Sequence, residues 1–148
     1  MEIDEAGITS ILTESRTIAV VGLSPRPERA SHQVARYLIA VGYRVIPVNP
    51  RQAEILGLRC YANLREVPER VDIVDCFRRS TEIPPIAEDA IAIGAKVLWL
   101  QLGVANEEAA RKAETAGLTV VRERCIKVDH AVLRIGSRPQ ASSSGKVS

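Results

Sequence analysis

Short, wholly apolar runs alternate along the chain with longer segments in which apolar residues recur every three or four positions. Three of these longer segments end in a glycine that is followed directly by an apolar run, at Gly42, Gly94 and Gly117. Apolar residues at that spacing form one face of a helix, and glycine just past a helix end adopts the left-handed conformation that stops it. Runs that are apolar on both faces are typical of strands inside a parallel sheet. The pattern therefore predicts an α/β fold, a doubly wound Rossmann-like parallel sheet with helices on both faces.

The same pattern gives the boundaries of the expected elements. Strands are expected at residues 17–22, 43–48, 59–61, 71–76, 96–100 and 119–121, with 59–61 as a short edge strand. Helices are expected at 4–13, 31–41, 85–93, 107–116 and 127–135, with a helical turn at 64–67. This order divides the chain into an N-terminal helix (1–15), a single Rossmann-like domain (16–135) and a tail (136–148) whose serine, glycine and proline content predicts flexibility.

Composition narrows the range of partners. The 148 residues suffice for one domain with its own core, and a net charge of +2 lacks the basic excess typical of nucleic-acid binding. Aromatic residues are only 3% of the chain, so a base-stacking platform is not expected. No apolar run reaches the ~18 residues of a membrane span, and the acidic N-terminus lacks the plan of a secretory signal. Three widely spaced cysteines without a C-x-x-C pair indicate a reducing compartment, so we expect a cytoplasmic protein without a metal site.

The basic residues are strongly biased toward arginine, which supplies 16 of the 20. Arginine is suited to paired hydrogen bonds with phosphates and carboxylates. Five arginines lie in the segments that follow three predicted strands: Arg26, Arg29, Arg51, Arg78 and Arg79. Because ligands of open parallel sheets bind beyond the carboxyl ends of the strands, the fold should bring these arginines to one crevice. The alternative is that they are ordinary solvated loop residues.

The expected ligand is therefore a polyanion, a nucleotide with several phosphates. The loop after the first strand leads into a helix N-terminus, which is a natural phosphate site. The predicted binding residues are Gly22, Leu23, Ser24, Arg26, Arg29, Ser31, Asn49, Pro50, Arg51, Phe77, Arg78, Arg79, Gln101 and Gly103. No residue is predicted to be catalytic or to ligate a metal.

The first loop departs from the dinucleotide fingerprint G-x-G-x-x-G, because Gly22 is followed by Ser24 and Pro25 and by no second or third glycine. An NAD site also has Asp or Glu at the end of the second strand for the ribose hydroxyls, where this chain has Asn49. Arg51 is placed to bind a ribose phosphate instead. From the residues alone, NADP and coenzyme A (CoA) both qualify.

Several stretches carry a family resemblance. The most specific are V-x-P-V-N-P at 45–50 and G-A-K-x-x-W-x-Q at 94–101, and others are I-A-V-V-G-L-S at 18–24, V-D-I-V-D at 71–75 and R-C-I-K at 124–127. Over roughly residues 5–135, the chain resembles the stand-alone CoA-binding proteins, which are similar to the N-terminal CoA-binding domain of the succinyl-CoA synthetase α subunit and of ADP-forming acyl-CoA synthetases.

The resemblance implies that CoA binds at the strand ends. The loop at 22–31 would hold phosphates, Asn49, Pro50 and Arg51 would contact the adenosine end, and Phe77 and Arg78 would border the cleft. The synthetases carry a second domain with a phosphorylated histidine. Neither His32 nor His130 has a matching context, so ligase activity is not expected.

Alternatives from different classes remain. The first is a module that binds CoA or an acyl-CoA as a carrier, sensor or regulatory subunit without chemistry of its own. The second is an NADP-binding oxidoreductase module, against which the lack of an evident proton donor counts. A third is a scaffold that dimerises, and a homodimer or an unidentified protein partner fits the sequence. Cys125 is either a small buried hydrophobe or a thiol that could react with CoA, and His130 has no assigned role.

Overall fold

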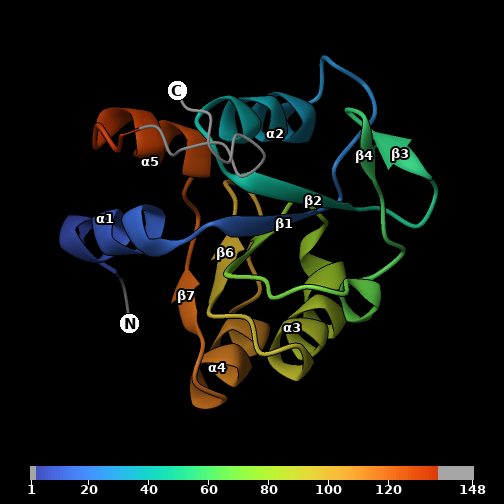
Figure 1. Cartoon of the computed structure of the whole chain (residues 1–148). Helices are drawn as coiled ribbons and strands as arrows, with labels where there is room; N and C mark the ends of the chain where they lie inside the picture. Colours follow the sequence, from blue (N-terminus) through green and yellow to red (C-terminus); the bar gives the residue numbers. More distant parts are fainter. Residues whose placement is uncertain (1–2, 137–148) are drawn as a thin grey trace.

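Five parallel strands form a central sheet in the order β2-β1-β5-β6-β7 in the computed structural model, which describes residues 3–136 (Figure 1). The strands of this sheet are β1 (Thr17–Val21), β2 (Arg44–Val48), β5 (Ile73–Cys76), β6 (Val97–Leu100) and β7 (Thr119–Val121). The helices are α1 (Glu5–Glu14), α2 (Ala30–Ala40), α3 (Ile83–Ala92), α4 (Glu107–Thr115) and α5 (Ile126–Val132), with 3-10 turns η1 (Leu64–Glu66) and η2 (Ser80–Glu82). The predicted doubly wound α/β fold is confirmed.

The strand order changes direction between β1 and β5. From β1 the chain moves outward to β2, whereas from β5 it moves the opposite way through β6 to β7. The carboxyl ends of β1 and β5 lie side by side, since Val21 pairs with Cys76. In open α/β sheets, a ligand crevice forms at this kind of switch point.

Helices cover both faces of the sheet (Figure 1). One face packs against α1, α2 and α5 through residues such as Leu12, Leu38 and Ile126. The other packs against α3 and α4, whose inward positions include Ala90 and Ala110. Alanine has a small side chain, so these two helices can approach the sheet closely. Every residue of β5 and β6 is buried. The continuous apolar run predicts this for β6, whereas β5 also contains a buried aspartate, Asp75.

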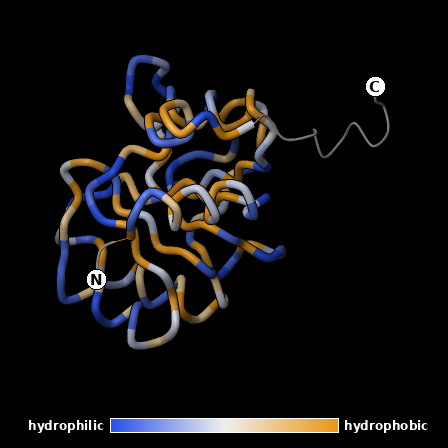
Figure 2. The backbone as a smooth tube through the Cα atoms, turned by 90° about the vertical axis from the view of Figure 1, so that its left-hand side faces the viewer, coloured by the Kyte–Doolittle hydropathy of each residue, from blue (hydrophilic) through white to orange (hydrophobic). Residues whose placement is uncertain are grey.

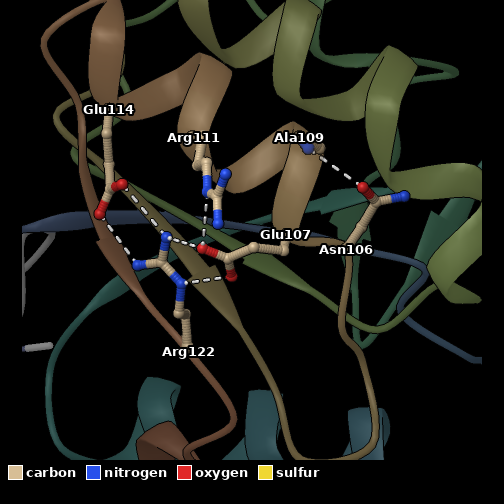
Figure 3. Close-up of polar contacts among 6 residues, drawn as sticks. All are labelled: Asn106, Glu107, Ala109, Arg111, Glu114 and Arg122. Atoms are coloured by element: carbon tan, nitrogen blue, oxygen red, sulfur yellow. Dashed lines mark hydrogen bonds and ion pairs between the residues drawn. The ribbon is translucent and has the colours of Figure 1, made fainter. Parts of the chain in front are cut away.

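An arginine links the end of β7 to α4. The Arg122 guanidinium, which follows β7, lies between the carboxylates of Glu107 and Glu114 on α4 (Figure 3). The four N···O distances are 2.9–3.1 Å. Arg111 also reaches Glu107, at 3.4 Å. At the start of α4, the Asn106 side chain accepts from the Ala109 N–H at 3.0 Å and caps the helix.

Helix α3 begins two residues earlier than the pattern predicts. The expected start was Pro85, but α3 starts at Ile83 and takes both Pro84 and Pro85 into its first turn. Backbone N–H groups of the first turn have no partner within the helix, so proline is tolerated there. At the other end of the chain, α5 ends at Val132, before the predicted limit of 135.

The expected edge strand at 59–61 takes a different form. A small antiparallel hairpin, β3 (Glu54–Ile55) and β4 (Leu58–Arg59), turns through Leu56 and Gly57, both at positive φ. Tyr61 then forms an isolated parallel bridge with Val48 at the outer edge of β2. Strands of two residues are too short to show a period in the sequence.

The hydropathy of the backbone follows these layers. Figure 2 shows hydrophilic segments along many of the outer loops and hydrophobic segments running through the interior. Within residues 3–136, no helix combines the length and the apolar character needed to cross a membrane. Of the tail predicted at 136–148, all but Gly136 lies outside the described residues.

Candidate functional site

Two adjoining pockets open at the carboxyl ends of β1, β2 and β5. The larger one, called here the polar pocket, has a volume of about 490 Å³. It is lined by Gly22, Ser24, Pro25, Arg29, Ala30, Ser31, Asn49, Phe77, Arg78, Arg79 and Glu82. The smaller one, called here the apolar pocket, has a volume of about 330 Å³. It is lined by Val21, Gly22, Val48, Pro50, Ala62, Asn63, Leu64, Arg78, Thr81, Glu82, Pro85, Ile86 and Asp89.

Three residues, Gly22, Arg78 and Glu82, line both pockets, so the two make up one crevice. The crevice lies at the switch point, because Gly22 directly follows β1 and Arg78 follows β5. One half therefore offers charged and hydroxyl groups, and the other offers aliphatic side chains. A ligand with an anionic part and a flat or apolar part matches this division.

The loop between β1 and α2 is held by its own polar groups. The Ser24 N–H donates to Ser31 Oγ at 2.9 Å, and the Arg26 N–H donates to Ser24 Oγ at 3.1 Å. The ring of His32 contributes a third contact, Nδ1 to the Ser24 carbonyl oxygen at 2.9 Å, for which Nδ1 must carry the proton. Ser31 and His32 are buried. These contacts preorganise the polar pocket, and they give His32 a structural role.

Asn49 links the loops that follow β1 and β2. Its Nδ2 donates to the Leu23 carbonyl oxygen at 2.9 Å, and its Oδ1 accepts from the Arg51 N–H at 2.8 Å. Both ends of the side-chain amide are thus engaged within the chain. An aspartate here could not donate to Leu23, which explains in physical terms why the acidic residue of an NAD site does not suit this position.

Gly22 lets the Arg78 side chain approach the backbone closely. Its φ is +88°, and a Cβ atom placed on it would lie 2.6 Å from Arg78 Cδ and 3.1 Å from the Phe77 carbonyl oxygen. Only glycine combines this backbone conformation with so little space. The Arg78 side chain therefore lies directly against the backbone that follows β1.

The arginines around the crevice differ in their partners from several others in the chain. Arg78 is bound to Glu82, with Nε and Nη2 both 2.7 Å from the same carboxylate oxygen. Arg26, Arg29, Arg51 and Arg79 have no carboxylate partner among residues 3–136. Elsewhere, arginines that pair with carboxylates include Arg44, Arg65, Arg111, Arg122 and Arg124. Four arginines without a carboxylate partner among the described residues thus lie in the loops around the crevice, and two of them, Arg29 and Arg79, line the polar pocket.

The structure brings most of the predicted binding residues to the crevice. Nine line one or both pockets: Gly22, Ser24, Arg29, Ser31, Asn49, Pro50, Phe77, Arg78 and Arg79. Arg26 and Arg51 are exposed but line neither pocket. Leu23 is fully buried in the core, and Gln101 is buried with its Oε1 accepting from the Ile126 N–H at 3.1 Å. Gly103 lies in an exposed turn after β6.

Sequence reasoning missed most of the apolar pocket and one charged residue of the polar pocket. The segment around Leu64 lines the apolar pocket from one side, and Pro85 and Ile86 on α3 line it too. Leu64 lies within residues 5–135, over which the family resemblance runs, and this was the available signal. Glu82 carried no signal in the sequence, because a lone acidic residue at the end of η2 resembles any other surface carboxylate.

Asp75 lies within the sheet, not in the crevice. It sits on the central strand β5 between Val20 and Trp99, and its side chain is fully buried. Neither of its oxygens has a hydrogen-bond partner among the described residues. Burial raises the pKa of this carboxyl well above its ordinary value, and burial raises the pKa of the neighbouring Cys76 thiol in the same way. Asp72 is used differently, since its carboxylate accepts from the N–H groups of Arg16 and Thr17.

The remaining candidates for chemistry lie away from both pockets. Cys125 is partly exposed and directly precedes α5. His130 is buried, and its Nδ1 lies 2.7 Å from the Tyr37 hydroxyl on α2. No three His, Cys, Asp or Glu side chains within residues 3–136 form a group that could hold a metal ion.

A family model described as a CoA binding domain matches residues 16–131. The chain belongs to this family. Among the relatives of this CoA-binding domain is YneT of Bacillus subtilis, which is 45% identical over 130 residues, covering 88% of this chain and 96% of YneT. A solved structure of a Pyrococcus horikoshii protein superposes with a TM-score of 0.88 at 41% identity, covering 89% of this chain and 93% of that one.

This domain is also similar to a part of much larger enzymes. An ADP-forming acetate–CoA ligase of Archaeoglobus fulgidus is 26% identical over 121 residues. The match covers 75% of this chain but only 18% of the ligase. The shared part is thus the CoA-binding domain, and most of the ligase has no counterpart here.

Proposed function

We propose that this chain binds coenzyme A, free or acylated, in the crevice formed by the polar and apolar pockets, and that it acts as a carrier, sensor or regulatory module. The observation that carries the proposal is the gathering of arginines without carboxylate partners at the switch point of a CoA-binding domain. CoA carries a diphosphate and a 3′-phosphate, so it offers several anionic groups to such a surface.

The diphosphate is assigned to the polar pocket. Ser24 and Ser31 fix the shape of the loop there, and Arg29 and Arg79 supply charge that no carboxylate of the described chain neutralises. The first turn of α2 adds backbone N–H groups, which favour an anion.

The adenosine end is assigned to the apolar pocket and its rim. The adenine would rest on aliphatic side chains, with Val48, Leu64 and Ile86 among the lining residues. Pro50 lines the same pocket, and Arg51 follows it at the exposed rim, where a 3′-phosphate could reach its guanidinium. This assignment needs no aromatic ring, in keeping with the few that the chain possesses.

Calorimetry tests the ligand. Titration at low salt with CoA and with dephospho-CoA should give binding for both, with CoA the tighter ligand because of its 3′-phosphate. The absence of heat with either ligand at 1 mM, a concentration at which even a weak complex of about 4 kcal/mol would form, contradicts the proposal.

A matched pair of variants tests the role of Arg51. Arg51→Ala should bring the affinities for CoA and dephospho-CoA close together. Arg70→Ala removes another exposed arginine, which precedes β5 and so lies at the amino end of that strand, away from the crevice, and it should leave the preference intact. An unchanged preference in Arg51→Ala would show that Arg51 does not bind the 3′-phosphate.

Thermal shifts distinguish the NADP alternative, which Arg51 also suits. NADPH and CoA are compared at equal concentration, since any ligand that binds only the folded chain raises its Tm. A shift with CoA and none with NADPH supports the proposal. A shift with NADPH alone would favour an oxidoreductase module instead.

A further inference from the structure

Glu82 is the one acidic residue among those lining the polar pocket. It ends η2 and directly precedes α3, and it lines the apolar pocket as well. Its carboxylate lies against Arg78, which also lines both pockets. A single negative charge thus lies where the two halves of the crevice meet, beside the arginines assigned to the ligand phosphates.

The contact occupies donors that a phosphate needs. Arg78 directs Nε and Nη2 to one oxygen of Glu82, each at 2.7 Å. This is the side of the guanidinium that forms paired hydrogen bonds with phosphate, so a phosphate on that side must replace the carboxylate. The two side chains are 39% and 38% exposed. Ion pairs that are this accessible to water contribute little to stability, so the exchange is easy.

Glu82 contributes nothing visible to the fold that would explain its position. It is the N-cap residue of α3, yet its side chain makes no capping hydrogen bond. Its carboxylate could serve to hold Arg78 in place, but Arg78 is already packed against Gly22. An exposed ion pair adds little to that packing, whereas a full negative charge beside a polyanionic ligand repels every phosphate nearby.

We propose that Glu82 sets the anion affinity of the crevice, as an internal counter-ion of Arg78 that a ligand phosphate replaces. A ligand with one anionic group gains little, because it only substitutes for the carboxylate. A ligand with a diphosphate also reaches Arg29 and Arg79, which have no carboxylate partner among the described residues. Glu82 therefore lowers the affinity of the crevice for every anion, so that only a ligand whose phosphates also reach these further arginines binds tightly. This inference rests on the proposed function for its natural ligand, but inorganic diphosphate tests it separately.

The test compares Glu82→Gln with the unchanged chain by calorimetry at low salt. The variant should bind CoA and inorganic diphosphate more tightly, by about three- to tenfold, the change expected from one charge at a partly exposed site. Uncharged pantetheine should show no gain. The gain should shrink as salt is added, since ions screen exposed charges. Glu82→Ala serves as a second variant, and a thermal scan shows that each is folded.

Glu88→Gln is the matched control. Glu88 lies on α3 and forms an ion pair with Lys112 at 2.9 Å, but it lines neither pocket. The substitution therefore removes the same charge and a similar pair outside the crevice. A comparable gain in both variants would mean that only net charge matters, and it would overturn the inference. Weaker or unchanged binding in Glu82→Gln would overturn it too, because Glu82 would then position Arg78. If Glu82→Gln binds diphosphate more tightly than the unchanged chain does, but neither protein binds CoA, the inference holds and the proposed function fails.

Discussion

The side-chain amide of Asn49 donates a hydrogen bond to the carbonyl oxygen of Leu23 at 2.9 Å. The two residues are 26 positions apart, and the contact joins the loops that leave two neighbouring strands of the sheet. With its other end, Asn49 accepts from the Arg51 N–H. The Asn49 side chain thus fixes the relative position of two loops beside the polar pocket.

Replacing Asn49 should disturb both binding and stability. Asn49→Ala leaves the Leu23 carbonyl and the Arg51 N–H without these partners, which we expect to lower the free energy of unfolding by about 1–2 kcal/mol. CoA binding should weaken by a similar free energy, since the two loops are no longer joined. Urea unfolding and calorimetry measure the two effects.

Asn49→Asp is the informative companion variant. It introduces the acidic residue typical of an NAD site, but it places a carboxylate oxygen against the Leu23 carbonyl. We expect weaker CoA binding and no NAD binding, because the aspartate is taken up by a repulsive contact within the chain. Measurable NAD binding by this variant would contradict the structural role assigned to Asn49.

Gly22→Ala should abolish binding and destabilise the chain. The added methyl group would lie 2.6 Å from Arg78 Cδ and 3.1 Å from a backbone oxygen, at a φ of +88°. Gly94→Ala is the matched control, because Gly94 has a φ of +74° but open space around it. The control isolates the conformational strain, about 1–3 kcal/mol. In chemical denaturation, Gly22→Ala should lose clearly more free energy of unfolding than Gly94→Ala does. Equal losses would show that the close approach to Arg78 is unimportant.

The sequence predicted the sheet and its helices because their patterns are local. Apolar runs and helical spacing are visible without knowledge of contacts, and β5 and β6 fall where the pattern places them. The hairpin at Glu54–Arg59 was not foreseen, since its strands are too short for a period. The roles of Asn49 and Gln101 were missed for another reason. A polar residue at a strand end suggests a ligand, and only the folded chain reveals that Leu23 and Ile126 supply its partners.

Asp75 should make stability depend on pH in a way that a single substitution removes. Burial raises the pKa of its carboxyl well above the ordinary value, so the folded chain holds the proton more firmly than the unfolded chain does. Its contribution is fully present below the unfolded pKa, about 3.9, and is lost as pH rises toward the folded-state pKa. Asp75→Asn does not titrate and escapes this loss.

The stability of Asp75→Asn relative to the unchanged chain should therefore increase with pH. The expected slope is up to about 1.4 kcal/mol per pH unit above pH 4, levelling off past the folded-state pKa. Urea unfolding at a series of pH values measures it. Asp75→Ala should show the same slope despite its different packing. Parallel curves for Asp75→Asn and the unchanged chain would rule out a protonated Asp75.

Arg122 should stabilise the fold at neutral pH and lose this effect in acid. Hydrogen bonds from its guanidinium lower the pKa of the Glu107 and Glu114 carboxyls. That contribution is present above the unfolded pKa of glutamate, about 4.3, and is lost as pH falls through the lowered values. At pH 7 and low salt, Arg122→Gln should reduce the Tm by about 2–4 °C, and the reduction should fade in acid.

Arg111→Gln provides the comparison for that experiment. Arg111 contacts Glu107 at 3.4 Å with a side chain that is 75% exposed, whereas the Arg122 side chain is 17% exposed. The Arg111 variant should leave the Tm almost unchanged. A loss as large as that of Arg122→Gln would show that the bridging position between two carboxylates has no special weight.

The bridge between Tyr61 and β2 has a consequence for assembly. The Tyr61 N–H donates to the Pro47 carbonyl oxygen at 3.0 Å, and the Tyr61 carbonyl oxygen accepts from the Asn49 N–H at 2.9 Å. Pro47 has no N–H of its own. A foreign strand can extend a sheet only along a row of unused donors and acceptors. The carboxyl half of β2 lacks that row, so a second molecule that docks on this side has to do so through side chains.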